Sequence, residues 1–138
     1  MKFYKCSHCG NIVAFVKNKG VPVMCCGQKM EEIVPNTSDG AAEKHLPVIN
    51  VNNPVINFNN TAINFNDSVI NVSVGSVAHP MEENHYIEWI ALQTKQGNQR
   101  KELKPGEKAE IAFALTEGDK PVAVYAYCNL HGLWKKEV

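Results

Sequence analysis

The chain has 138 residues, enough for one ordinary domain or for a small module attached to a domain of about 100 residues. Its 14 basic and 14 acidic residues cancel, and the pI near 6.9 argues against a protein that binds nucleic acid electrostatically. No run of about 18 apolar residues occurs, and the first residues lack the apolar core of a signal peptide, so we expect no membrane span. The sequence thus predicts a cytoplasmic protein, in which clustered cysteines more often bind metal than form disulfides.

The five cysteines and five histidines fall into two groups along the chain. Four cysteines lie within the first 26 residues: Cys6, Cys9, Cys25 and Cys26. The fifth cysteine shares the rest of the chain with four histidines: His45, His79, His85, Cys128 and His131. This partition predicts two separate metal sites.

Residues 1–35 predict a small β module built around the first group. A Cys-x-x-Cys knuckle at Cys6–Gly10 precedes a short strand over residues 12–16, and a turn at 18–20 returns the chain to the adjacent pair Cys25 and Cys26. A core this small needs the folding energy of a metal cross-link. Four thiolates indicate tetrahedral zinc or iron, whereas a disulfide between adjacent cysteines would be strained. His8, between two ligands, is expected to be a solvated loop residue.

A linker over residues 36–44 is predicted to lead into a second domain over residues 45–138. Residues 48–72 of this domain contain a seven-residue tandem repeat of the type Val-Ile-Asn-Val/Phe-Asn-Asn-x, in which the seventh residue varies. Its β-branched residues, asparagines and proline oppose a helix, and an odd period conflicts with one continuous strand. We interpret the repeat as an extended or irregular β hairpin, away from the chemistry.

The remainder of the second domain predicts strands and turns, with no clear helix. Residues 85–93 form a long strand pattern, and residues 121–127 deliver the chain to Cys128. In residues 109–115, the apolar positions 109, 111, 113 and 115 alternate with Glu110, Ala112 and Ala114, which predicts a half-buried strand. Short strands at regular spacing predict an antiparallel β-sandwich of the immunoglobulin-like class.

Cys128 and His131 stand three residues apart in one tight loop beside a glycine, so that both can reach a single metal. A thiolate with imidazoles favours zinc, copper or iron over hard cations. Each histidine taken singly is more often a core or surface residue than a ligand. Together, however, four imidazoles and one thiolate exceed the needs of tetrahedral zinc and leave one octahedral position open.

The motifs around these residues resemble those of the superoxide reductases, and the chain as a whole resembles the two-iron form of that family, the desulfoferrodoxins. The N-terminal cysteines resemble the desulforedoxin-type iron centre. Three segments resemble the signatures of the catalytic domain: Glu43–Pro47, Gly75–Trp89 and Tyr127–Trp134. The resemblance covers nearly all of the chain outside the repeat, where members of the family have a much shorter connection.

The resemblance implies one-electron reduction of superoxide to hydrogen peroxide with uptake of two protons. The catalytic iron would have an axial thiolate and four equatorial imidazoles: Cys128, His45, His79, His85 and His131. Glu43 would ligate the oxidised iron, and Lys44 would attract the anionic substrate; without the resemblance the two form a solvated charge pair. The N-terminal iron would be an auxiliary centre reduced by a rubredoxin-like donor, and the chain would form a homodimer.

Three other functions remain open at this point. A non-catalytic iron electron-transfer protein would bind the same metals, although an open coordination position argues against it. A zinc-stabilised interaction module would be colourless, whereas ferric thiolate centres absorb visible light. A superoxide dismutase would release oxygen and need no reductant.

Overall fold

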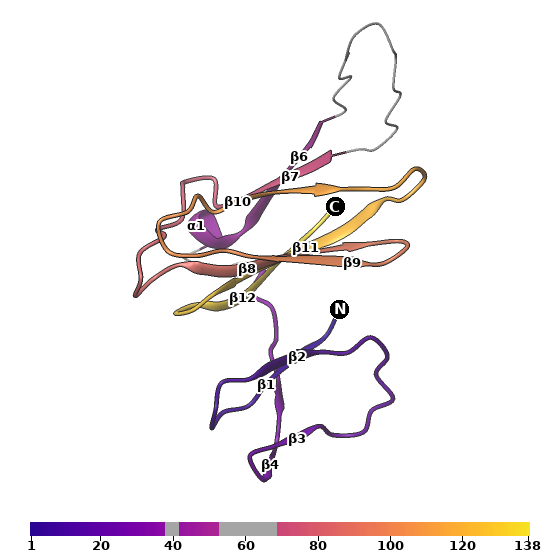
Figure 1. Ribbon diagram of the computed structural model, residues 1–138, viewed down its shortest axis with the longest axis vertical. Coiled ribbons are helices and arrows are strands. Elements are labelled where there is room, and N and C mark those ends of the chain that lie inside the picture. The colour runs from indigo at the N-terminus through magenta and orange to yellow at the C-terminus, as the bar shows by residue number, and fades with distance from the viewer. Residues whose placement is uncertain (38–41, 53–68) are drawn as a thin grey trace, which may run out of the picture. The chain divides into compact units, whose positions relative to one another are not determined.

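The computed structural model describes residues 1–37, 42–52 and 69–138, and the chain divides into two compact units, Met1–Pro35 and Asn36–Val138 (Figure 1). The larger unit carries the great majority of the buried side chains. Within the described residues, no helix is long and apolar enough to cross a membrane.

The N-terminal unit consists of two small antiparallel sheets. β1 lies between β2 and β5, and β3 pairs with β4. Its buried apolar residues are few (Phe3, Cys6 and Met30), which fits the expectation that metal supplies much of its stability. The predicted strand over 12–16 ends at residue 14, and Val16 is fully exposed. The strands are β1 (Phe3–Lys5), β2 (Ile12–Ala14), β3 (Met24–Cys25), β4 (Gln28–Lys29) and β5 (Glu31–Glu32).

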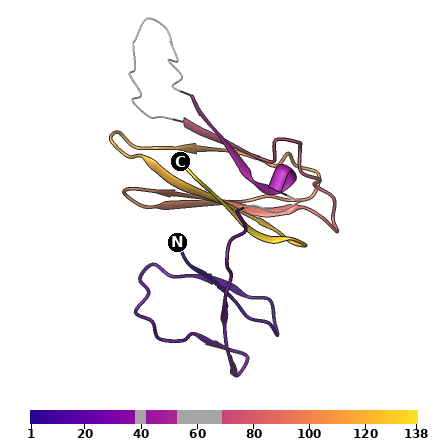
Figure 2. The same ribbon diagram turned by 180° about the vertical axis from the view of Figure 1, so that it is seen from behind.

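The larger unit is a two-layered antiparallel β-sandwich, which confirms the predicted fold class (Figures 1 and 2). One layer has the strand order β10-β7-β6 and the other has the order β12-β11-β8-β9. Its elements are α1 (Ala42–His45), β6 (Pro47–Asn52), β7 (Val69–Val74), β8 (Ile87–Thr94), β9 (Asn98–Glu102), β10 (Glu110–Ala114), β11 (Pro121–Cys128) and β12 (Gly132–Glu137).

The core lies between the two layers and extends to the metal-ligating end of β11. Phe113 on β10 is fully buried whereas its neighbours Ala112 and Ala114 are exposed, as the apolar alternation predicts. The central strands β8 and β11 are buried on both faces near their middles. Cys128, the last residue of β11, belongs to the same core cluster, so the sandwich itself fixes the position of its sulfur.

One helical turn, α1, was not expected from the sequence. Ala42, Glu43 and Lys44 are good helix formers, with the acidic residue first and the basic residue last, as the helix dipole favours. Pro47 limits the turn by disfavouring helical conformation just before it. A single turn has no apolar periodicity, so the pattern that reveals longer helices is absent. The turn matters because it ends on His45.

The hairpin formed by β6 and β7 uses the first and last copies of the repeat. Asn50 of β6 pairs with Asn71 of β7, and Pro47 pairs with Val74. The two ends of the repeat therefore form an antiparallel strand pair, as expected for the predicted hairpin. The middle copies, residues 53–68, lie outside the described residues.

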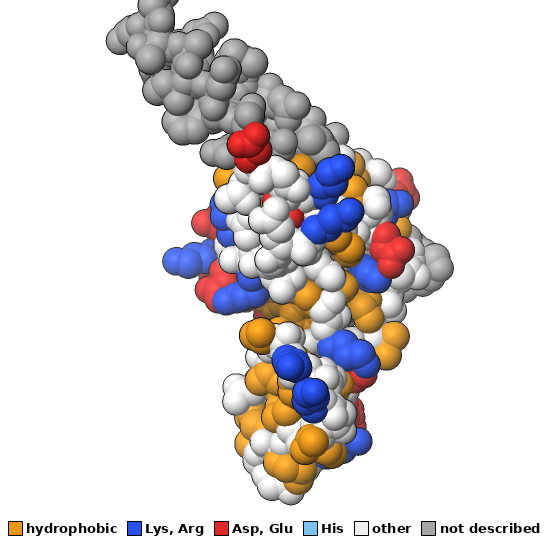
Figure 3. Space-filling model, turned by 90° about the vertical axis from the view of Figure 1, so that its right-hand side faces the viewer, with side chains coloured by type: hydrophobic (Ala, Val, Ile, Leu, Met, Phe, Trp, Pro, Cys, Tyr) orange, Lys and Arg blue, Asp and Glu red, His pale blue; other side chains and the backbone are white. Residues whose placement is uncertain are grey.

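Side chains of both charge signs are interspersed on the face shown in Figure 3, in keeping with the balanced composition. Exposed hydrophobic side chains occur on both units, and on the N-terminal unit they include Val16, Val21, Met24 and Val34.

Candidate metal centres

The four N-terminal cysteines come together at one point. Cys6 and Cys9 follow β1, and Cys25 and Cys26 lie at the turn between β3 and β4. Their sulfur atoms are all within 4.8 Å of one another, the separation between Cys9 and Cys25 being 3.6 Å. The sulfurs of Cys25 and Cys26 are 3.9 Å apart and the thiols are free, which excludes the strained disulfide. His8 is exposed, as expected for a solvated loop residue.

The thiols of this cluster differ strongly in acidity. The backbone N–H of Cys9, assisted by that of His8, lowers the pKa of Cys6 to about 6. Hydrogen bonds to the sulfurs of Cys9 and Cys25 raise the pKa of Cys26 to about 12. Four thiolates this close together cannot all be charged unless a cation lies among them. The cluster is therefore built for a thiophilic metal, which displaces the remaining protons on binding.

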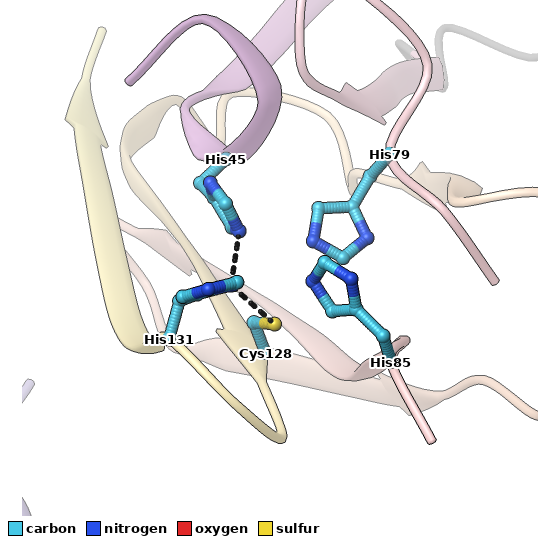
Figure 4. Close-up of side chains that lie close together, drawn as sticks. All are labelled: His45, His79, His85, Cys128 and His131. Atoms are coloured by element: carbon cyan, nitrogen blue, oxygen red, sulfur yellow. Dashed lines mark hydrogen bonds between the residues drawn. The ribbon is translucent and has the colours of Figure 1, made fainter. Parts of the chain in front are cut away.

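The second cluster combines donors from three separate segments of the sandwich: α1, the connection between β7 and β8, and the end of β11 with the turn that follows it. His45 ends α1, His79 lies in the loop after β7, and His85 precedes β8. Cys128 ends β11, and His131 occupies the turn that leads into β12. One ligand atom from each of these five residues lies within 4.8 Å of all the others. Figure 4 shows the four rings and the sulfur turned toward one common space.

The four imidazole rings occupy the corners of a near-square. Adjacent ring centroids are 4.6 to 4.8 Å apart around the circuit His45–His79–His85–His131, and adjacent ring planes are steeply inclined, by 72° to 77°. The diagonal from His45 to His85 is longer, at 6.2 Å. Four imidazoles at the corners of a square, with the Cys128 sulfur as a fifth donor, could all bind one metal ion.

The donor atoms fit a metal ion. The Nε2 atoms of His79 and His85 are buried and have no hydrogen-bond partner among the described residues, which is costly unless a ligand satisfies them. His45 Nε2 lies 2.9 Å from His131 Nδ1, which in turn lies 3.5 Å from the Cys128 sulfur (Figure 4). Metal–ligand bonds of about 2.0–2.3 Å place donor atoms at separations of this order.

The protonation of the cluster favours metal binding by imidazole nitrogen. Burial lowers the pKa of His79 to about 4, and burial followed by the charges of His131 and His45 lowers the pKa of His85. His79 Nδ1 lies 2.6 Å from the Pro80 carbonyl oxygen and donates to it as the neutral tautomer, which leaves Nε2 free to ligate. Burial raises the pKa of Cys128, and the backbone N–H groups of His131 and Leu130 oppose that rise. Metal binding would release this thiol proton.

Comparison with known proteins places both clusters within one family. The family model described as desulfoferrodoxin matches residues 37–137, and that of the desulfoferrodoxin N-terminal domain matches residues 1–33. Desulfoferrodoxin from Nitratidesulfovibrio vulgaris is 47% identical over 136 residues, covering 99% of this chain and 95% of its own length. The chain belongs to the desulfoferrodoxin family.

The solved structures agree with this membership. The superoxide reductase from Treponema pallidum is 33% identical with a TM-score of 0.74, covering 99% of this chain and 96% of its own. The superoxide reductase (neelaredoxin) from Archaeoglobus fulgidus in the reduced form is 26% identical with a TM-score of 0.55, covering 75% of this chain and 95% of its own. The two donor sets of this desulfoferrodoxin family member fit the two irons that the family resemblance implies.

Asn129 is a supporting residue that the sequence analysis missed. Its side-chain oxygen accepts from the backbone N–H of Tyr86 at 2.9 Å, and its side-chain nitrogen donates to the Asn84 carbonyl at 3.1 Å. These two bonds bracket His85, and Asn129 itself follows Cys128. The Asn129 side-chain amide therefore links the loop that carries His85 to the turn that carries Cys128 and His131. Only its position between Cys128 and His131 marked it in the sequence.

Gly75 and Ser76 hold α1 in place. The Glu43 carbonyl accepts from the backbone N–H of Ser76 at 2.9 Å and from its hydroxyl at 3.1 Å. Gly75 has a φ of +85°, and a Cβ at this position would lie 2.6 Å from the Lys44 carbonyl oxygen. This close backbone approach requires glycine and fixes the turn that carries His45.

Glu43 and Lys44 lie next to the cluster but outside its donor set. Both side chains are exposed, and the Glu43 carboxylate is not among the grouped ligand atoms. Lys44 nevertheless acts on the site electrostatically, since its charge is one of the smaller causes that lower the pKa of His85.

Trp134 was grouped with the C-terminal motif but given no role by the sequence. Its indole stacks on the His45 imidazole, with ring centroids 4.8 Å apart and planes 16° from parallel. Trp134 is buried, so it forms a rigid wall behind the His45 donor.

Proposed function

We propose that the chain is a superoxide reductase, in which superoxide takes up one electron and two protons to give hydrogen peroxide. The observation that carries this proposal is the cluster of four imidazoles and one thiolate, five donors that leave one octahedral position for a small ligand. Buried Cys128 and exposed His131 place the cluster between the core and the surface, where a small anion can reach it. The similar structure from Treponema pallidum is itself called a superoxide reductase.

Iron bound to this cluster would supply the single electron, and His45, His79, His85, His131 and Cys128 would hold it. The Cys128 thiolate would donate electron density to the bound metal, as thiolate ligands do in haem enzymes. Backbone N–H groups of Leu130 and His131 would moderate that donation by hydrogen bonding to the sulfur. We assign Glu43 to ligation of the oxidised metal and Lys44 to attraction of the substrate anion.

The four-cysteine site is proposed to hold a second iron that passes electrons on, with a rubredoxin-like protein as the donor. Cys9 and Cys26 are exposed, so an electron can enter this site from the surface of the N-terminal unit. A purely electron-transferring protein would use both metals without reacting with superoxide.

The reaction itself separates these functions. Iron-loaded protein is reduced and exposed to a pulse of superoxide, and peroxide, oxygen and the visible spectrum are followed. We expect one peroxide for each superoxide consumed, no oxygen, and growth of a ferric–thiolate band. Release of oxygen would indicate dismutation, and absence of a fast reaction would indicate an electron carrier.

Lys44→Ile should slow the bimolecular reaction with superoxide by about tenfold at low salt. The chain has no net charge, so attraction of the anion depends on local fields, which can raise association rates by roughly 10 to 1,000-fold and which salt weakens. Pulse radiolysis across a salt series measures the effect, and Lys120→Ile, which removes the same charge from an exposed loop, serves as the control. Equal rates and salt slopes for the two variants would remove Lys44 from this role.

Cys9→Ser should disturb only the four-cysteine centre. The two donor sets share no residue and belong to separate units of the chain. We therefore expect the visible spectrum of the N-terminal metal to change, while the first turnover of pre-reduced protein with superoxide stays within about twofold of the unmodified chain. Stopped-flow measurement of that first turnover is the check. A collapse of its rate would show that the N-terminal metal takes part in the chemistry.

A further inference from the structure

The indole of Trp134 lies face to face with one of the four donor rings. Its plane is 16° from parallel with the His45 imidazole, and the ring centroids are 4.8 Å apart. The neighbouring donor rings of His79 and His131 instead meet His45 edge-on, at 73° and 74°. The π face of the indole is therefore presented to His45, within the roughly 6 Å over which such a face attracts positive charge.

The backbone of Trp134 is held on both sides. In β12 it pairs with β11, and on its other side it forms a parallel bridge to Asn36. Asn36 donates from its backbone N–H to the Leu133 carbonyl at 2.8 Å and accepts from the backbone N–H of Lys135 at 3.0 Å. His45, by contrast, ends a helix of four residues, and so short a helix has little stability of its own. The indole is thus the more firmly fixed of the two rings.

Tryptophan at position 134 leaves one polar atom unpaired. The indole Nε1 is buried and has no hydrogen-bond partner among the described residues, which is unfavourable for a buried donor. Phenylalanine would fill much of the same space without this N–H group. Tryptophan, however, has the face that attracts positive charge most strongly among the aromatic side chains. The residue type therefore favours a role for the indole face beyond filling space.

The His45 ring carries positive charge when it binds a metal. An imidazole that gives a nitrogen lone pair to a metal cation becomes partly positive, and more so when the metal loses an electron. His45 and Trp134 are only 2% and 1% exposed, so little water screens the attraction between the imidazole and the indole. The indole face should therefore favour the oxidised, more highly charged form of the site over the reduced form.

We propose that Trp134 is a positioning residue that lowers the reduction potential of the metal at the five-donor site through its stack on His45. It holds the plane of the imidazole and stabilises the charge that this ring gains on oxidation. Because this role needs a metal that changes its charge by one, it rests on the proposed function. A lower potential makes the reduced site a stronger donor of the single electron that superoxide takes up.

Smaller faces at position 134 test this role. In iron-loaded full-length protein, Trp134→Phe and then Trp134→Leu remove progressively more of the π face. Redox titration followed at the visible thiolate band of the five-donor site should give potentials that rise from the unmodified chain to Trp134→Phe and then to Trp134→Leu. For Trp134→Leu we expect a shift of the redox equilibrium toward the reduced form of about two- to fivefold, or roughly 20–40 mV for one electron.

The sign of the shift separates this role from a purely structural one. A smaller side chain that only loosened the packing would admit water, and water favours the more highly charged oxidised form, so the potential would fall. Trp89→Phe is the matched control, because the buried indole of Trp89 is also stacked, 5.3 Å from the Tyr127 ring, but Tyr127 is not a donor. The potential of Trp89→Phe should equal that of the unmodified chain.

An unchanged or lower potential in the two Trp134 variants would overturn the role of Trp134 and leave the proposed function in place. A rise in Trp89→Phe as large as that in Trp134→Phe would do the same, because the effect would then not depend on the stack on His45. If Trp134→Leu loses its metal, the comparison of Trp134→Phe with the unmodified chain decides. An unmodified chain whose five-donor site shows no one-electron step would instead overturn the proposed function, and the role of Trp134 with it.

Discussion

Replacing Cys128 with serine should reduce the rate of the superoxide reaction by at least roughly 100-fold. Mutating a residue that only hydrogen-bonds to a metal ligand already lowers metal affinity or activity by about 10- to 100-fold, and Cys128 is itself a proposed ligand. The thiolate is the one soft anionic donor in the cluster, and a serine hydroxyl does not replace it. Serine is close to cysteine in size, and its hydroxyl can accept from the N–H groups that face the sulfur, so the sandwich should fold.

The visible spectrum separates this loss from unfolding. The thiolate band of the catalytic metal should disappear in Cys128→Ser, while the absorption of the four-cysteine centre remains, because that centre draws no ligand from the larger unit. A Cys128→Ser chain that still reacts rapidly with superoxide would contradict the assignment of the site.

Gly75→Ala should destabilise the larger unit by about 1–3 kcal/mol from its backbone conformation alone. Its φ is +85°, and the added Cβ would lie 2.2 Å from the Val77 carbonyl oxygen and 2.6 Å from that of Lys44. Both oxygens belong to the backbone, so no side chain can move aside to make room, and the turn that carries His45 must shift. We therefore expect weaker metal retention at the five-donor site as well as a lower melting temperature.

Gly118→Ala is the matched control for that prediction. Gly118 has a similar φ of +79°, but a Cβ there would meet nothing within 4 Å. Thermal unfolding and metal content of the two variants therefore separate backbone strain from the close approach to α1. If both variants lose the same stability and both keep their metal, the contact between Gly75 and Lys44 does not position the site.

The donor residues could be predicted from the sequence because ligand chemistry limits the choice of residue type. Cysteine and histidine are scarce, and the spacing of Cys128 and His131 permits a shared metal. The structure brings together the same two groups that the sequence partition proposed. The β-sandwich could also be predicted from the sequence, because a strand such as residues 109–115 shows its apolar alternation within a few consecutive residues.

The roles of the supporting residues could not be predicted from the sequence, because they depend on contacts between residues that are far apart along the chain. Asn129 acts through backbone groups at positions 84 and 86, and Trp134 acts by stacking on His45. Strands β9 and β12 were not predicted either. β9 is exposed and polar over most of its length, and β12 is polar in its second half, so neither shows a sustained apolar alternation.

The most direct measurement of the central claim is metal analysis of the purified chain, with visible spectra recorded before and after a mild reductant. Two donor sets of four sulfurs and of four imidazoles with one sulfur predict two irons per chain. Oxidised protein should show two thiolate-to-iron absorptions that bleach on reduction, one of which is absent from Cys128→Ser. A colourless protein that contains zinc at both sites, or a spectrum from the four-cysteine centre alone in fully metallated protein, would contradict the account.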